Sequence, residues 1–387
     1  MQKLLKCGKI LSVRDGKVLT DGVIVVKDDV IVFIGKADEY QASSPVQEID
    51  LSDMTVLPGM IDCHTHLKLH FGDPPGEIYP EPELYEMLKC VRNMRWDIRC
   101  GLTTIRNLSE RSYRAVPLKH AINNELIPGP RILSGIRGIR PTHGWGMNAF
   151  GFDGVDALRK AIRENVAAGA DLIKIYVTGE AWKDTSTACY MTKEEIQACT
   201  DEAHMVGLKI AAHCHGGIGL RYCLEAGIDT IEHGAMMTED DINLFLKHGT
   251  TLIATFNPYM HEATLASPRP KEFVTGVKRV QANMNSVFPK ALKSGIKFSV
   301  GTDARHGNYV FELETLVNFG LSPMEAICAG TYQAALALGI DNNTGSLEVG
   351  KWADIIAVNG DPLLNISALR DIRFVMKAGI EQELSEK

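Results

Sequence analysis

The chain lacks several features that would place it in a particular class of protein. Its 387 residues include 41 lysines and arginines against 48 acidic residues, a formal net charge of −7, which argues against a role on nucleic acids or anionic membranes. No apolar run approaches the ~20 residues that span a bilayer, and no stretch resembles a signal peptide. The nine cysteines include no Cys-X-X-Cys pair. We therefore expect reduced cysteines and a cytoplasmic protein without nucleic-acid or membrane partners.

What the sequence does contain is a series of metal-binding side chains at the ends of apolar segments. The first are His64 and His66, which follow the apolar residues of 54–61. Residues two apart on an extended strand point to the same side, so the two imidazoles converge while Thr65 faces away. Neutral imidazole is the commonest metal ligand and suits several divalent ions. Because such a pair also occurs by chance on strands, the rest of the chain decides its meaning.

Lys174 lies inside the apolar run 170–179, which is rich in branched residues and ends in glycine, as buried parallel strands do. An ordinary ammonium group in such a place is costly. Either the lysine pairs with a buried carboxylate or extends past the strand end, or desolvation has removed its charge. A neutral amine can react with carbon dioxide to form a carbamate, an anion able to bridge two cations. The neighbouring histidines favour the carbamate.

Three further apolar segments end in potential ligands, namely His213 with His215, then His233, then Asp303. A single histidine at a strand end is often only a hydrogen-bonded rim residue. Three such segments in succession, each after a helix-like segment, are harder to attribute to chance. Because His213 and His215 share one side of a regular strand, the spacing leaves open which of them binds metal.

Strand-like and helix-like segments alternate over residues 57–340. This alternation predicts parallel strands, and in an eight-stranded βα barrel the carboxyl ends of the strands meet at one mouth, where catalytic residues gather. We predict an α/β fold with a (βα)8 TIM-like barrel over residues 58–351. The short strand-like pieces of residues 1–57 and 352–387 are each too small for a core of their own, and we expect them to form one composite β-sandwich.

Together these motifs resemble the amidohydrolase superfamily, and within it the branch of imidazolonepropionase-related hydrolases, prolidase-like dipeptidases and ochratoxinase-like amidases. The resemblance covers nearly the whole chain. Its motifs are VLPGMIDCHTHL, DLIKIYVTG, KIAAHCHG, DTIEHG, SVGTDA and GSLEVGKWADIIAVNGDPL. The resemblance implies a βα barrel with a composite β-sandwich, a binuclear centre in which zinc is the usual metal, and a small-molecule or dipeptide substrate. Relatives of this kind often form homo-oligomers.

The resemblance also implies a role for each strand-end residue. The matched positions are His64 and His66 for the more buried metal, Lys174 for the bridging carbamate, His213 and His233 for the second metal, and Asp303 for the catalytic aspartate. Two divalent cations bring four positive charges, of which the carbamate, the aspartate and a bridging hydroxide remove three. The expected reaction is hydrolysis of an amide bond in a dipeptide, as in prolidases, or in an N-acyl amino acid. The bridging hydroxide attacks the carbonyl, and Asp303 acts as general base and then general acid.

A second group of residues is expected to contact the substrate rather than the metals. Tyr176 lies two residues past Lys174 on the same side of the strand, and an arginine could bind a substrate carboxylate. For each arginine taken singly, a solvated loop position is the plainer interpretation. The expected set is His143, Tyr176, His215, Arg140, Arg305 and His306.

Other functions compete with amide hydrolysis. Cyclic amides, lactones, esters and phosphotriesters are alternatives because the same hydroxide could attack them. A mononuclear deaminase or imidazolonepropionase-type enzyme would lack the bridging lysine, and deaminases typically carry a glutamate shortly after the third histidine, where this chain has Cys214 and His215. A catalytically inactive scaffold is disfavoured because all six matched positions are filled.

Overall fold

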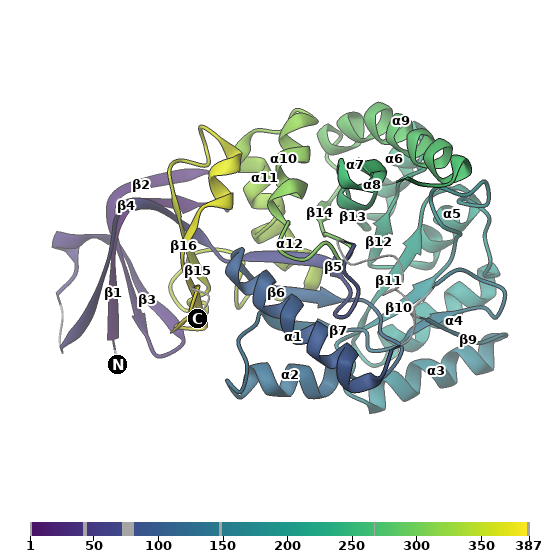
Figure 1. Ribbon diagram of the computed structural model, residues 1–387, viewed down its shortest axis with the longest axis horizontal. Helices are drawn as coiled ribbons and strands as arrows, with labels where there is room; N and C mark the ends of the chain where they lie inside the picture. Colours follow the sequence, from purple (N-terminus) through teal and green to yellow (C-terminus); the bar gives the residue numbers. More distant parts are fainter. Residues whose placement is uncertain (1, 42–44, 72–80, 147–148, 267, 385–387) are drawn as a thin grey trace.

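The computed structural model describes residues 2–41, 45–71, 81–146, 149–266 and 268–384 of the chain. Figure 1 shows a large α/β part beside a smaller β-sheet part, and the smaller part contains strands from both the beginning and the end of the chain. Within the described ranges, no helix combines the length and the apolar composition needed to cross a membrane. All nine cysteines are free thiols, as expected.

Eight parallel strands form the TIM-like barrel of the α/β part, in agreement with the prediction. They are β5 (Met60–Thr65), β6 (Leu102–Asn107), β7 (Arg131–Ser134), β10 (Leu172–Tyr176), β11 (Lys209–Cys214), β12 (Thr230–His233), β13 (Thr251–Ala254) and β14 (Phe298–Val300). The strands β5, β6 and β7 form one hydrogen-bonded sheet in that order. The strands β10, β11, β12, β13 and β14 form another, which also contains the short strands β8 (Gly138–Arg140) and β9 (Ala149–Gly151). Among the described residues these strands therefore do not form one closed ladder.

The two sheets nevertheless meet at both seams. At one seam the Asp171 amide donates to the Ser134 carbonyl over 2.9 Å, and at the other the Asp303 amide donates to the His64 carbonyl over 2.8 Å. Gly301 permits this second approach, because a Cβ atom at that position would lie 2.4 Å from the His64 amide nitrogen. The carboxyl ends of β5 and β14 are thereby brought together.

Most of the helices cover the outside of the barrel (Figure 1). Thr192 shows how one of them begins: its side chain accepts from the Glu195 amide, and Glu195 accepts in return from the Thr192 amide, a reciprocal capping box. The helices are α1 (Glu83–Arg99), α2 (Ala115–Asn123), α3 (Val155–Ala167), α4 (Lys193–Met205), α5 (Gly217–Ala226), α6 (Glu239–His248), α7 (Asn257–Met260), α8 (Ala263–Ala266), α9 (Lys271–Lys293), α10 (Val310–Asn318), α11 (Pro323–Ala329) and α12 (Tyr332–Leu338).

The smaller part is built by both ends of the chain. Its strands are β1 (Gln2–Ser12), β2 (Lys17–Lys27), β3 (Val30–Lys36), β4 (Val46–Pro58), β15 (Ile355–Asn359), β16 (Ile372–Lys377) and β17 (Ile380–Glu381). They form one hydrogen-bonded sheet in the order β17-β16-β15-β4-β1-β2-β3, so the expected sandwich is a single continuous sheet in its hydrogen bonding. Its apolar side chains share a core of their own, which includes Leu5, Val56 and Phe374. The exact domain boundaries stay a prediction.

Candidate metal and active site

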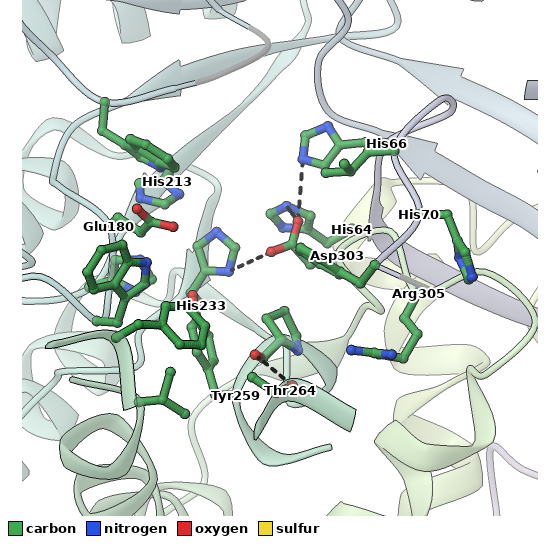
Figure 2. A pocket seen from close by; sticks show the side chains of 18 of the residues that line it. His64, His66, His70, Glu180, His213, His233, Tyr259, Thr264, Asp303 and Arg305 are labelled. Atoms are coloured by element: carbon green, nitrogen blue, oxygen red, sulfur yellow. Dashed lines mark hydrogen bonds and ion pairs between the residues drawn. The ribbon is translucent and has the colours of Figure 1, made fainter. Parts of the chain in front are cut away.

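A cavity of about 320 Å³ lies at the carboxyl ends of the barrel strands. Its inner wall carries most of the ligands expected from the sequence, namely His64, His66, His213, His233 and Asp303, together with Tyr176 and His215. Figure 2 shows His64, His66 and His233 around Asp303. Residues from five different strand ends thus meet in one pocket, as a barrel of parallel strands predicts.

His64, His66 and Asp303 form the tightest cluster, with potential ligand atoms that all lie within 4.8 Å of one another. The Oδ1 atom of Asp303 is 3.3 Å from His64 Nε2 and 3.4 Å from His66 Nε2. Both histidines are buried. Two imidazoles and a carboxylate in this arrangement are a typical donor set for a divalent transition metal, so the residues present fit a metal ion.

Neighbouring groups orient the two imidazoles. His64 donates from Nδ1 to the Glu232 carboxylate over 2.7 Å, and Arg106 holds the other Glu232 oxygen at 2.7 Å. His66 donates from Nδ1 to the Ser109 carbonyl over 3.0 Å. Each Nδ1 atom is thereby engaged in an outer hydrogen bond, and each Nε2 atom faces Asp303. Such an outer hydrogen bond accompanies nearly every metal-bound histidine.

The presence of an outer hydrogen bond also distinguishes His213 from His215. His213 donates from Nε2 to the Gly179 carbonyl over 3.1 Å, and His233 Nδ1 lies 2.8 Å from the Thr255 hydroxyl. Neither ring nitrogen of the fully buried His215 has a hydrogen-bond partner among the described residues. Burial lowers the pKa of His215 to about 3, so its ring is neutral. The outer hydrogen bonds favour His213 and His233 as metal ligands and leave His215 facing the cavity with two unpaired nitrogens.

Lys174 is fully buried on β10, and its ammonium nitrogen has no hydrogen-bond partner within the part of the chain that the structure describes. The nitrogen lies 5.0 Å from the centre of the Tyr176 ring. Burial lowers the pKa of Lys174 to about 8, against the opposing effect of Glu232. Among the described residues Lys174 forms no ion pair with a buried carboxylate, which was one alternative. Its burial excludes the other alternative, in which the side chain reaches solvent.

Asp303 is held ionised and in a strained backbone conformation. Burial by itself would raise the pKa of this carboxyl, but His64, His66 and His233 lower it well below its usual range. The φ angle is +48° at Asp303, +74° at Ala304 and +74° at His233. Non-glycine residues in this region cost about 1–3 kcal/mol each and tend to gather at functional sites. The surrounding fold imposes these conformations, which aim Asp303 and His233 at the cluster.

The residues expected at the substrate divide into two groups. Tyr176 and Arg305 line the cavity together with His215. His143 is exposed and packs edge-on against Tyr190, 5.6 Å between ring centres, and Arg140 donates to the carbonyls of its own loop. Neither residue is part of the cavity wall.

His306 is likewise absent from that wall, since it is buried between two fixed partners. Its Nδ1 atom lies 2.7 Å from the Asp97 carboxylate, and its Nε2 atom lies 2.9 Å from the His66 carbonyl. Burial opposes protonation, yet Asp97 raises the pKa of His306. His306 therefore holds the segment that carries His66 and does not line the cavity.

Several residues of the site were not singled out from the sequence. Glu232 is the main one, and a signal for it existed, because a charged residue inside a buried strand attracts the same attention as Lys174. Burial by itself would raise the pKa of Glu232, but Arg106 and His64 lower it to about 2. The outer part of the cavity had no such signal, because its members come from loops and helices. They are Leu69, His70, Phe71, Trp145, Glu180, Trp182, Pro258, Tyr259, Ala263, Thr264, Arg269, Phe273 and Val277.

Comparison with known proteins agrees with this site. The chain matches the model of the Amidohydrolase family over residues 55–382. It is 27% identical to ochratoxinase from Aspergillus niger, with 95% of this chain and 83% of that protein covered. It is 23% identical to imidazolonepropionase from Acinetobacter baumannii, with 92% of each covered. A solved Xaa-Pro dipeptidase with methionine bound in its active site superposes with a TM-score of 0.89 at 29% identity, covering 99% of this chain and 100% of the other. The chain therefore belongs to the amidohydrolase family and is a hydrolase acting on C–N bonds.

Proposed function

We propose that this protein is a binuclear metal-dependent hydrolase that cleaves the amide bond of a dipeptide or an N-acyl amino acid. The observation that carries the proposal is Lys174, a buried amine without a hydrogen-bond partner among the described residues, beside a histidine–aspartate cluster. An isolated ammonium there would be costly, whereas a carbamate would supply a bridging anion. The Xaa-Pro dipeptidase and ochratoxinase among the similar proteins support an amide substrate.

The environment of Lys174 favours carbamate formation. With a pKa of about 8, roughly one lysine in eleven is neutral at pH 7, against about one in 3,000 for a pKa of 10.5. The reactive fraction is therefore raised about 300-fold by burial. Addition of the neutral amine to carbon dioxide forms an N–C bond and releases one proton, so no further reactant is needed.

The donor set is sufficient for two metals. We assign His64 and His66 to one ion, His213 and His233 to the other, the Lys174 carbamate to both, and Asp303 to the first. Zinc is the proposed metal because imidazole and carboxylate oxygen suit it. When bound, the pair of ions would polarise the scissile carbonyl and lower the pKa of the attacking water.

Asp303 is proposed to move the proton. Its carboxylate is ionised and lines the cavity, so it can accept a proton from the attacking water and pass it to the leaving nitrogen. His215 presents two unpaired ring nitrogens to the same cavity and is proposed to contact the carbonyl under attack. The filled Lys174 position argues against a mononuclear deaminase. Cyclic amides, lactones, esters and phosphotriesters are the substrates to test if linear amides fail.

The test is metal content and amide hydrolysis measured together. The chain would be loaded with zinc in bicarbonate buffer, and amino-acid release would be followed from a library of dipeptides and N-acyl amino acids. We expect two metals per chain and release by the wild type, whereas Asp303→Asn should lose at least ~10²-fold in kcat. The exposed Asp201→Asn on α4 is the matched control and should behave as wild type. One metal per chain, or full activity in Asp303→Asn, would contradict the proposal.

A further inference from the structure

The cavity contains a buried cation without a hydrogen-bond or ion-pair partner among the described residues. Arg305 is only 8% exposed, and its Nε atom makes no hydrogen bond to any described residue. Within the described ranges its guanidinium forms no ion pair, and its Cζ atom lies 5.8 Å from the centre of the Phe71 ring. The carboxyl of Glu312 is already occupied by the Phe256 and Asn257 amides. A buried, unpaired guanidinium is costly unless a bound ligand supplies an anion.

A carboxylate lines the cavity on the opposite side of the ligand cluster. Figure 2 shows Glu180 beside His213, with Asp303 between Glu180 and Arg305. Glu180 is partly buried and forms a hydrogen bond with Trp182, yet it has no ion pair among the residues that the structure describes. Glu180 and Arg305 thus lie at either side of Asp303, and therefore of the position where a carbonyl would be attacked.

Part of the cavity wall is aromatic. Trp182 and Phe273 pack edge to face with ring centres 5.2 Å apart, and Trp145 and Tyr259 add further aromatic surface. The volume of about 320 Å³ lies at the lower end of ligand pockets, roughly 300–1,000 Å³. This space suits two residues with apolar side chains better than a longer peptide.

We propose that the substrate is an unblocked, apolar dipeptide whose α-ammonium binds Glu180 and whose α-carboxylate binds Arg305. This inference rests on the proposed function and narrows it, because an N-acyl amino acid would satisfy Arg305 but leave Glu180 facing an uncharged group. In this orientation the residue that carries the ammonium supplies the scissile carbonyl. The residue that carries the carboxylate leaves as the free amino acid.

The experiment compares three peptides that share one scissile bond, namely leucyl-phenylalanine, its N-acetyl derivative and its C-terminal amide. Hydrogen bonds to charged groups contribute about 1.5–3 kcal/mol, which corresponds to roughly 10–150-fold. We expect kcat/KM of the wild type to fall by a factor in this range for each blocked peptide. Glu180→Gln should lose the same factor on the free dipeptide and nothing further on the N-acetyl peptide. Arg305→Met should lose the same factor in kcat/KM on the free dipeptide and nothing further on the C-terminal amide.

Two controls distinguish substrate binding from a structural role. Arg221→Met removes an exposed arginine from α5, outside the cavity wall, and should change kcat/KM by less than about threefold. Arg305→Met should leave Tm unchanged or raise it, because the buried charge has no partner to lose. A lowered Tm, or an equal loss on all three peptides, would overturn the role of Arg305.

Binding measured apart from turnover separates this inference from the proposed function. Calorimetry with zinc-loaded Asp303→Asn protein should show the same preference for the free dipeptide over both blocked forms. If that preference is present but the wild type cleaves none of the peptides, the proposed function is wrong and the binding assignment holds. If the wild type cleaves the N-acetyl peptide as well as the free dipeptide, the assignment of Glu180 is wrong and amide hydrolysis holds.

Discussion

Replacement of Lys174 by methionine should make the metal-free protein more stable. The lysine is fully buried without a hydrogen-bond partner among the described residues, and its pKa is about 8 instead of 10.5. In metal-free, carbonate-free protein at pH 7 the native state must hold this ammonium group in a fully buried site, without a hydrogen-bond partner among the described residues. Methionine is unbranched and of similar size, so it fills the same space without charge.

The magnitude follows from the difference in pKa. A shift of about 2.5 units corresponds to about 3 kcal/mol, at about 1.4 kcal/mol per unit. Below pH 8 the lysine is protonated in both the folded and the unfolded state, and the full cost is present. Between pH 8 and 10.5 the unfolded chain binds more protons than the folded one, so the unfolding free energy of the wild type rises with pH. The advantage of Lys174→Met should therefore be about 3 kcal/mol at pH 7 and disappear near pH 10.5.

Urea denaturation at pH 7 and pH 10, with a chelator and carbonate-free buffers, measures this difference. The exposed Lys160→Met on α3 is the matched control and should show no such pH-dependent gain. If Lys174→Met were less stable than the wild type at pH 7, the ammonium would have a stabilising partner in the fold. Lys174 would then not be a neutral, carbamate-forming amine.

Two further predictions concern the ligand shell. His213→Asn should lose one of the two metals, whereas His215→Asn should keep both metals and lose mainly kcat. Atomic emission measures the metal content and steady-state kinetics measure kcat. The opposite pattern would identify His215 as the ligand. Glu232→Gln should weaken zinc binding by roughly 10–100-fold without removing a ligand, because His64 loses its charged hydrogen-bond acceptor. Competition with a chromogenic chelator measures this change, and unchanged affinity would show that Glu232 serves only the barrel core.

Some features of the site depend on local sequence and were therefore predictable. His64 and His66 face the same side because side chains alternate along a strand, whatever the rest of the fold does. Lys174 was conspicuous because an ionisable residue interrupts an apolar run. The alternation of strands and helices indicated a barrel, and a barrel brings the ends of its strands together. These inferences needed only periodicity and the cost of burying charge.

Other features depend on which strands and loops lie side by side, and no local pattern contains that information. Glu232 reaches His64 across 168 positions of sequence, and His306 turns away from the cavity because Asp97 and the His66 carbonyl bind both of its ring nitrogens. The same holds for Glu180 and Arg305, which belong to separate loops and face one cavity only because the barrel fold brings these loops to the same end. The sequence by itself determined the ligand types and the side of each strand that carries them, because both follow from residue chemistry and the two-residue repeat. Tertiary structure alone decided the hydrogen-bond partners and the shape of the cavity, because both require contacts between segments distant in the chain.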